Sequence, residues 1–191
     1  MVTTRNTRAD VVAAAGRLFA YKGYHGTSMR DLGKELGLLG SSLYAHIESK
    51  QDLLVAVVEE GARLFQESAQ TALTVEGSAA DRLRALVAGH IDVVLDNHDV
   101  VGTFLNEARV LDDAHRARVI AARDAYEGAF RSVIADGISD GSFRSDVDPK
   151  LASIFILSIL NAVQRWYRVD GELDPGQLAD RIDRFVADSL R

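Results

Sequence analysis

Apolar residues recur along the chain at intervals of three and four, which is the period of an amphipathic α-helix. The first segment with this period carries Val11, Val12, Ala15, Leu18 and Phe19. The period returns near residues 53–65, 83–95, 104–105, 119–134, 151–167 and 178–190. No stretch alternates apolar and polar residues in the manner of a half-buried strand. The pattern therefore predicts an all-α chain of about nine helices.

Helix-stopping and helix-capping residues separate these segments. Ser28 is expected to be the N-cap of a second, short helix, with Asp31 three residues later forming an imperfect capping box. Glycines are expected to end helices or mark turns at Gly23, Gly37, Gly77, Gly137 and Gly141. Pro149 and Pro175 suit the first position of the last two helices.

The composition is that of an ordinary globular protein. Of the 191 residues, 47% are hydrophobic and 26% are charged, which is enough to bury a core. The chain has no cysteine, which excludes disulfides, a thiol nucleophile and a Cys-ligated metal site. No run approaches the roughly 18–20 apolar residues of a membrane span, and residues 1–8 lack the apolar segment of a signal peptide. We therefore expect a cytoplasmic protein without membrane contact.

Charge is distributed unevenly along the chain. Residues 1–50 carry 7 Lys and Arg against 4 Asp and Glu, a net charge of +3, whereas residues 51–191 carry 15 against 24, a net charge of −9. A basic head on an acidic body suggests that one end meets a polyanion, although a difference of a few charges also arises by chance.

The basic head has the spacing of a helix-turn-helix. Three short helices are predicted within residues 8–47, and only residues 37–39 separate the second from the third. In that motif the second helix of the pair enters the major groove of DNA. The third helix offers small or flat polar side chains, namely Ser41, Ser42, Tyr44 and His46. Hydroxyl groups of this kind reach phosphates or base edges, so the head is predicted to bind DNA.

About residues 8–55 resemble the N-terminal domain of TetR-family transcriptional regulators. The residues that carry the resemblance are Leu18-Phe19, Gly23-Tyr24, Thr27-Ser28-Met29-Arg30-Asp31-Leu32, Gly37-Leu38, Ser42-Leu43-Tyr44-Ala45-His46-Ile47, Ser49-Lys50 and Leu53-Leu54. The chain departs from the family pattern at Gly33, Leu39 and Ser41, which affects the cap and the base contacts of the third helix rather than the fold.

The resemblance implies a homodimeric repressor on a near-palindromic DNA operator. It places a helix-turn-helix domain at residues 1–50 and a helical domain for effector binding and dimerisation at residues 51–191. Position by position, it implies DNA contacts from Thr27, Ser28, Gly40, Ser41, Ser42, Tyr44, His46 and Lys50. For Tyr44 a partly buried core position remains an alternative, and Ser28 is a cap whether or not it touches DNA.

The body carries no enzyme signature and no histidine pair with metal-ligand spacing, so neither catalytic residues nor a metal or other cofactor is expected. Surface or capping roles account for the histidines, His90 among them. Polar residues that interrupt apolar helices are typical of a small-molecule site. The candidates are Phe104, Asn106, Arg109, Asn161, Arg165 and Trp166. Ion pairs for the arginines and core or dimer packing for Trp166 are the alternatives.

Two segments resemble family members that sense lipid or sterol catabolites, often as coenzyme A thioesters. They are residues 37–44 and residues 164–171. The resemblance implies a hydrophobic or acyl-CoA-like effector that releases the repressor from DNA. An all-α enzyme and a helical interaction protein that has lost DNA binding are the competing functions.

The helix predicted over residues 151–167 is apolar nearly all round. Such a helix must be buried on every side, and a second subunit would cover the face that a small chain leaves bare. A central helix inside one protomer is the alternative. The predicted dimer interface comprises Phe155, Ile159, Leu178, Ile182 and Phe185.

Overall fold

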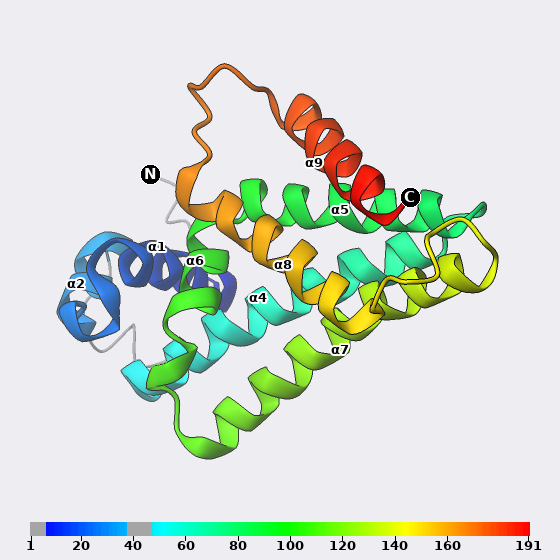
Figure 1. The fold of residues 1–191 in the computed structure, drawn as a ribbon. Coiled ribbons are helices and arrows are strands. Elements are labelled where there is room, and N and C mark those ends of the chain that lie inside the picture. Colours follow the sequence, from blue (N-terminus) through cyan, green and yellow to red (C-terminus); the bar gives the residue numbers. More distant parts are fainter. Residues whose placement is uncertain (1–6, 38–46) are drawn as a thin grey trace. The chain divides into compact units, whose positions relative to one another are not determined.

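The computed structural model describes residues 7–37 and 47–191, which are helical throughout their regular elements (Figure 1). These residues form helices α1 (Arg8–Gly26), α2 (Met29–Leu36), α4 (Lys50–Leu73), α5 (Ala79–Asp96), α6 (His98–Asn106), α7 (Asp113–Ser139), α8 (Pro149–Trp166) and α9 (Pro175–Leu190), with a 3₁₀ turn η1 (Ala108–Val110). The all-α prediction is confirmed. The predicted third helix, residues 40–47, falls outside the described residues except for its last position.

Helix starts follow the predicted capping signals. The Ser28 hydroxyl accepts a hydrogen bond from the Asp31 amide at 3.1 Å, and the Asp31 carboxylate accepts one from the Ser28 amide at 2.9 Å. The capping box is thus complete rather than imperfect. Thr7 and Ser78 cap α1 and α5 in the same way. Pro149 and Pro175 occupy first-turn positions of α8 and α9, as predicted.

Two glycines behave differently from the prediction. Gly23 has φ 73° and breaks the helical geometry, but one more turn follows it to Gly26, so it kinks α1 rather than ending it. Gly137 lies inside α7, which continues to Ser139, and the turn comes at Gly141 with φ 81°. Gly137 is needed for close packing, because the Phe143 ring occupies the place of a side chain there.

The chain divides into two compact units. Unit 1 comprises residues 1–62 and 99–120, and unit 2 comprises residues 63–98 and 121–191. Helices α4 and α7 contribute residues to both. Compactness thus assigns residues 51–62 and 99–120 to the unit that contains α1 and α2, while the domain boundary predicted at residue 50 stays a prediction.

In unit 1, α6 packs tightly against α1 and α4. A Cβ atom at Gly16 of α1 would come within 3.1 Å of Val100, and the Thr103 hydroxyl donates to the Gly16 carbonyl at 3.3 Å. A Cβ at Gly61 of α4 would lie only 2.7 Å from Phe104 Cβ. These glycines therefore set how closely α6 approaches its two neighbours.

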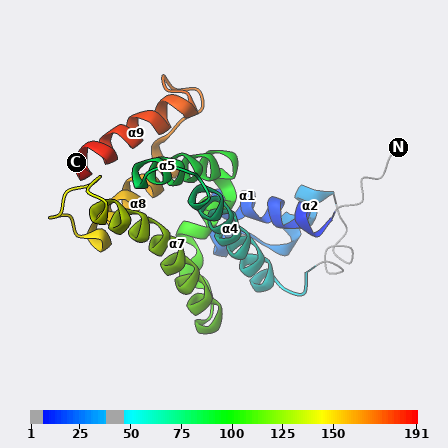
Figure 2. The same cartoon turned by 90° about the vertical axis from the view of Figure 1, so that its right-hand side faces the viewer.

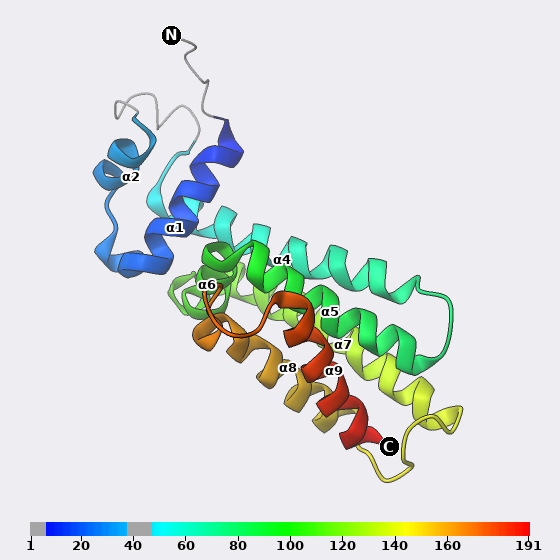
Figure 3. The same cartoon turned by 90° about the horizontal axis from the view of Figure 1, so that it is seen from above.

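In unit 2, α5 lies beside α8 and α9 (Figure 2 and Figure 3). An ion pair between Arg84 and Asp183, at 3.0 Å, joins α5 to α9 at the surface. Fully buried apolar side chains from four helices form the core of this unit, among them Leu86, Ile91, Phe130, Ile134, Leu160 and Leu178.

Candidate functional site

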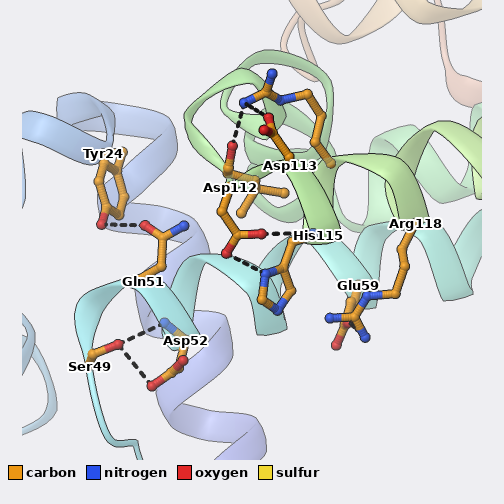
Figure 4. A network of polar contacts seen from close by, with 11 residues as sticks. Tyr24, Ser49, Gln51, Asp52, Glu59, Asp112, Asp113, His115 and Arg118 are labelled. Carbon is orange, nitrogen blue, oxygen red and sulfur yellow. Dashed lines mark hydrogen bonds and ion pairs between the residues drawn. The ribbon is translucent and has the colours of Figure 1, made fainter.

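Lys50, at the start of α4, is tied to the connection between α1 and α2. Its ammonium donates hydrogen bonds to the carbonyls of Tyr24, at 2.7 Å, and Thr27, at 2.8 Å, and lies 4.1 Å from the centre of the Tyr24 ring. The Tyr24 hydroxyl in turn donates to the Gln51 side chain at 2.9 Å (Figure 4). The first turn of α4 therefore clamps the segment that leads into α2.

Thr27 and Ser28, both predicted to contact DNA, shape the same connection. Thr27 is buried, and its hydroxyl donates to the Gly23 carbonyl at 2.9 Å, while the Ser28 hydroxyl belongs to the capping box of α2. Their DNA contacts stay predictions. Gly40, Ser41, Ser42, Tyr44 and His46 lie outside the described residues, and their contacts stay predictions as well.

Polar contacts within unit 1 link α4 to the first turns of α7 (Figure 4). Glu59 of α4 and Arg118 of α7 form an ion pair at 3.2 Å. Ser49 caps α4 by exchanging hydrogen bonds with Asp52. Neither of these contacts is among the predicted site features. The Ser49-x-x-Asp52 spacing is a local capping signal, whereas nothing near Glu59 points to a partner 59 residues away.

The six predicted ligand-binding residues are divided between the units. Phe104, Asn106 and Arg109 belong to unit 1, and Asn161, Arg165 and Trp166 to unit 2. Phe104 is buried against Gly61, and the Asn106 amide donates to the Gly102 carbonyl of its own helix at 2.8 Å. Arg109, Arg165 and Trp166 are exposed, and Asn161 is half-buried. Their part in effector binding stays a prediction.

A buried polar pair in unit 2 contradicts the surface or capping role predicted for His90. This residue is 1% exposed, and its Nδ1 lies 3.1 Å from the Tyr126 hydroxyl. The Phe65 ring packs on the imidazole with centroids 4.8 Å apart. Burial lowers the pKa of His90 to about 3, so the ring is neutral at pH 7. Among the described residues, no hydrogen-bonding group meets its Nε2.

Helices α8 and α9 expose apolar side chains on one face. Phe155 and Phe185 are each 63% exposed, and both line a groove of about 500 Å³ together with Ile159. Leu178 and Ile182, also predicted at the dimer interface, are 2% and 8% exposed because they face the interior of the protomer. The outward apolar surface of the protomer therefore includes three of the five predicted interface residues.

In the described residues the structure has two capped N-terminal helices, an all-helical body and an exposed apolar face on α8 and α9. These features agree with the helical DNA-binding regulator that the sequence predicts. Residues 11–57 match the bacterial regulatory proteins of the tetR family, and residues 76–190 match the tetracyclin repressor-like C-terminal domain. The chain belongs to the TetR family of transcriptional regulators.

Individual relatives span nearly the whole chain. It is 27% identical over 188 residues to the HTH-type transcriptional repressor KstR2 of Rhodococcus jostii, covering 96% of this chain and 90% of that protein. The structure of the TetR-family regulator PfmR from Thermus thermophilus is similar with a TM-score of 0.86 and 30% identity, covering 93% and 97% of the two chains. AibR in complex with isovaleryl coenzyme A and operator DNA is similar with a TM-score of 0.85 and 27% identity, covering 93% and 96%.

No helix in residues 7–37 and 47–191 combines the length and hydropathy needed to cross a membrane.

Proposed function

We propose that this protein represses transcription by binding an operator and that an acyl thioester or a related lipid-derived ligand releases it. The observation that carries the proposal is the similarity along 93% of the chain to a regulator whose crystals hold both isovaleryl coenzyme A and operator DNA. The relative named as a repressor covers the chain equally well. A regulator that recognises a thioester must bind it without converting it, so we infer that the protein acts by binding and not as an enzyme. Because operator DNA lies in the cytoplasm, we infer that the protein works there.

The partner proposed for the exposed face of α8 and α9 is a second copy of the same chain. Phe155 and Phe185 are largely exposed to solvent in the protomer. Moving such a side chain from full exposure to full burial contributes roughly 1.5–3 kcal/mol, so covering both would stabilise an assembly. A two-fold dimer carries two helix-turn-helix heads, one for each half of a near-palindromic operator.

The test is a binding titration on the DNA upstream of the protein's own coding region. Fluorescence anisotropy is expected to show tight binding by the wild-type protein and weaker binding by Tyr44→Ala, whose hydroxyl is predicted to contact the DNA backbone. Adding isovaleryl coenzyme A or longer acyl-coenzyme A thioesters is expected to release the wild-type protein. Binding that survives every thioester up to millimolar concentration would contradict the ligand class, and failure to bind any upstream DNA would contradict the repressor.

A further inference from the structure

The buried pair His90–Tyr126 lies within the core of unit 2. His90 comes from the inward face of α5, Phe65 from α4, and Tyr126 from α7. The Tyr126 ring stacks edge-on against Phe130, with centroids 5.5 Å apart. The imidazole therefore sits in aromatic surroundings, where a polar atom without a hydrogen bond is unfavourable.

The hydrogen bonds open to the His90–Tyr126 pair favour one tautomer of His90 over the other. Burial raises the pKa of Tyr126, so its phenol keeps a proton to donate. If Tyr126 donates to Nδ1, one group of the pair, the Nε2–H donor, has no partner among the residues that the structure describes. If Nδ1–H donates to Tyr126 instead, the phenol proton and the Nε2 lone pair are both left. The first arrangement leaves fewer unsatisfied groups, and it leaves a hydrogen-bond donor.

A neutral donor in aromatic surroundings favours an uncharged hydrogen-bond acceptor over a charged one. A carboxylate would bring an uncompensated charge into this core, which is far more costly than a neutral oxygen. A keto or thioester carbonyl accepts a hydrogen bond and carries no charge. Because neighbouring side chains cover the ring, a ligand reaches Nε2 only after one of them changes its rotamer.

We propose that His90 Nε2–H donates a hydrogen bond to a neutral carbonyl oxygen of the effector, and that Tyr126 fixes the tautomer that makes this possible. The inference rests on the proposed function and deepens it, because it names the atom of the protein that recognises the reactive end of a lipid-derived ligand. In this arrangement the carbonyl lies beside Phe65 and Tyr126, and the apolar part of the ligand replaces contacts among the surrounding side chains.

The first test needs no ligand. Long-range ¹H–¹⁵N correlation spectra of the full-length ¹⁵N-labelled protein at pH 7 distinguish the two neutral tautomers from imidazolium. We expect the Nε2–H tautomer for His90, and a mixture of tautomers in Tyr126→Phe, which removes the donor to Nδ1. A wild-type His90 with its proton on Nδ1, or a charged ring, would overturn the proposal.

The second test compares two probes that differ in one oxygen. Octanoyl-coenzyme A has a thioester carbonyl, and its thioether analogue octyl-coenzyme A has none. Calorimetry is expected to show that His90→Phe weakens binding of the thioester by about 5- to 10-fold, the equivalent of one hydrogen bond, and leaves the thioether unchanged. Ser153→Ala is the matched control, because it removes a buried polar group whose hydrogen bonds to Glu127 and the Lys150 carbonyl lie within the protein.

The outcomes separate this inference from the proposed function. Equal losses for both probes in His90→Phe, or an unchanged thioester affinity, would overturn the hydrogen bond while leaving the thioester as ligand. If neither probe binds the wild-type protein, octanoyl-coenzyme A is excluded as a ligand and the hydrogen bond proposed for its carbonyl fails, while the tautomer spectrum still decides whether His90 presents a donor. If His90→Phe does not fold, Tyr126→Phe carries the comparison, with a smaller selective loss for the thioester expected.

Discussion

Replacing Lys50 with methionine tests whether the first turn of α4 holds the head together. Methionine keeps most of the length of the apolar stem and removes the ammonium. The carbonyls of Tyr24 and Thr27 then lose a charged donor at 2.7 and 2.8 Å, and Tyr24 loses the cation over its ring.

The magnitude follows from these three contacts. A hydrogen bond to a charged group contributes about 1.5–3 kcal/mol, and a cation over an aromatic ring about 0.5–1 kcal/mol at an exposed site. The two carbonyls share one ammonium and lie in a part-buried region that water reaches, so the contributions do not add fully. We expect Lys50→Met to lower the free energy of unfolding by about 2–3 kcal/mol.

Urea denaturation followed by circular dichroism measures this loss, and anisotropy on operator DNA at low temperature measures binding by the fraction that remains folded. Lys34→Met is the matched control, because it makes the same chemical change at an exposed position of α2. It is expected to alter stability by less than about 0.5 kcal/mol. If Lys50→Met left stability unchanged but weakened operator binding, the stabilising role of the Lys50 contacts with Tyr24 and Thr27 would be refuted. That result would favour the predicted contact of Lys50 with DNA.

Three further results are expected. Phe155→Asp puts an unpaired charge on the face proposed for the second copy, and sedimentation should show monomers or aggregates; a stable dimer would exclude this face. Arg109→Ala and Arg165→Ala should bind operator normally but need a higher concentration of acyl thioester for release. If either guanidinium meets the ligand's anionic end, its loss should weaken the free energy of ligand binding by about 1.5–3 kcal/mol. Titration curves like that of the wild type for both variants would rule the two arginines out as anchors. Hydrogen bonds from Ser28 lower the pKa of Asp31 to about 2, below its unfolded value, so the stability contributed by this cap is present above pH 4 and lost as the pH falls toward 2. Asp31→Asn should flatten that part of the acid denaturation curve, and an identical curve would show that the cap contributes nothing.

Local signals predicted the parts of the fold that depend on local chemistry. The capping box of Ser28 joins groups only three residues apart, and the prolines at the starts of α8 and α9 suit a first turn because proline has no amide hydrogen to leave unpaired there. Local spacing therefore identifies both signals. The sequence predicts that Gly23 ends the first helix, whereas the structure has a kink there and a further turn to Gly26. Glycine signals a positive φ, but whether a helix resumes afterwards depends on what the next residues pack against.

The candidate site depends on contacts that spacing cannot supply. Lys50 meets carbonyls 23 and 26 residues earlier, and His90 meets a hydroxyl 36 residues later. A solvent-exposed position for either side chain would fit the sequence equally well. Likewise, the period of α9 shows that Leu178, Ile182 and Phe185 are apolar, but only packing against α5 decides that the first two face inward.

Unit 1 is built from two stretches of chain that residues 63–98 separate, and this has a consequence for synthesis. The Thr103 hydroxyl reaches the Gly16 carbonyl across 87 residues, and Phe104 covers Gly61. While the ribosome synthesises the intervening residues, the apolar sides of α1 and α4 are exposed, because α6, which covers them in the folded protein, has not yet been made. The end of the chain that reads DNA emerges first, yet it is completed only when Ile120 has emerged. A nascent or prematurely terminated chain of residues 1–62 is therefore expected to be captured by chaperones rather than to occupy an operator.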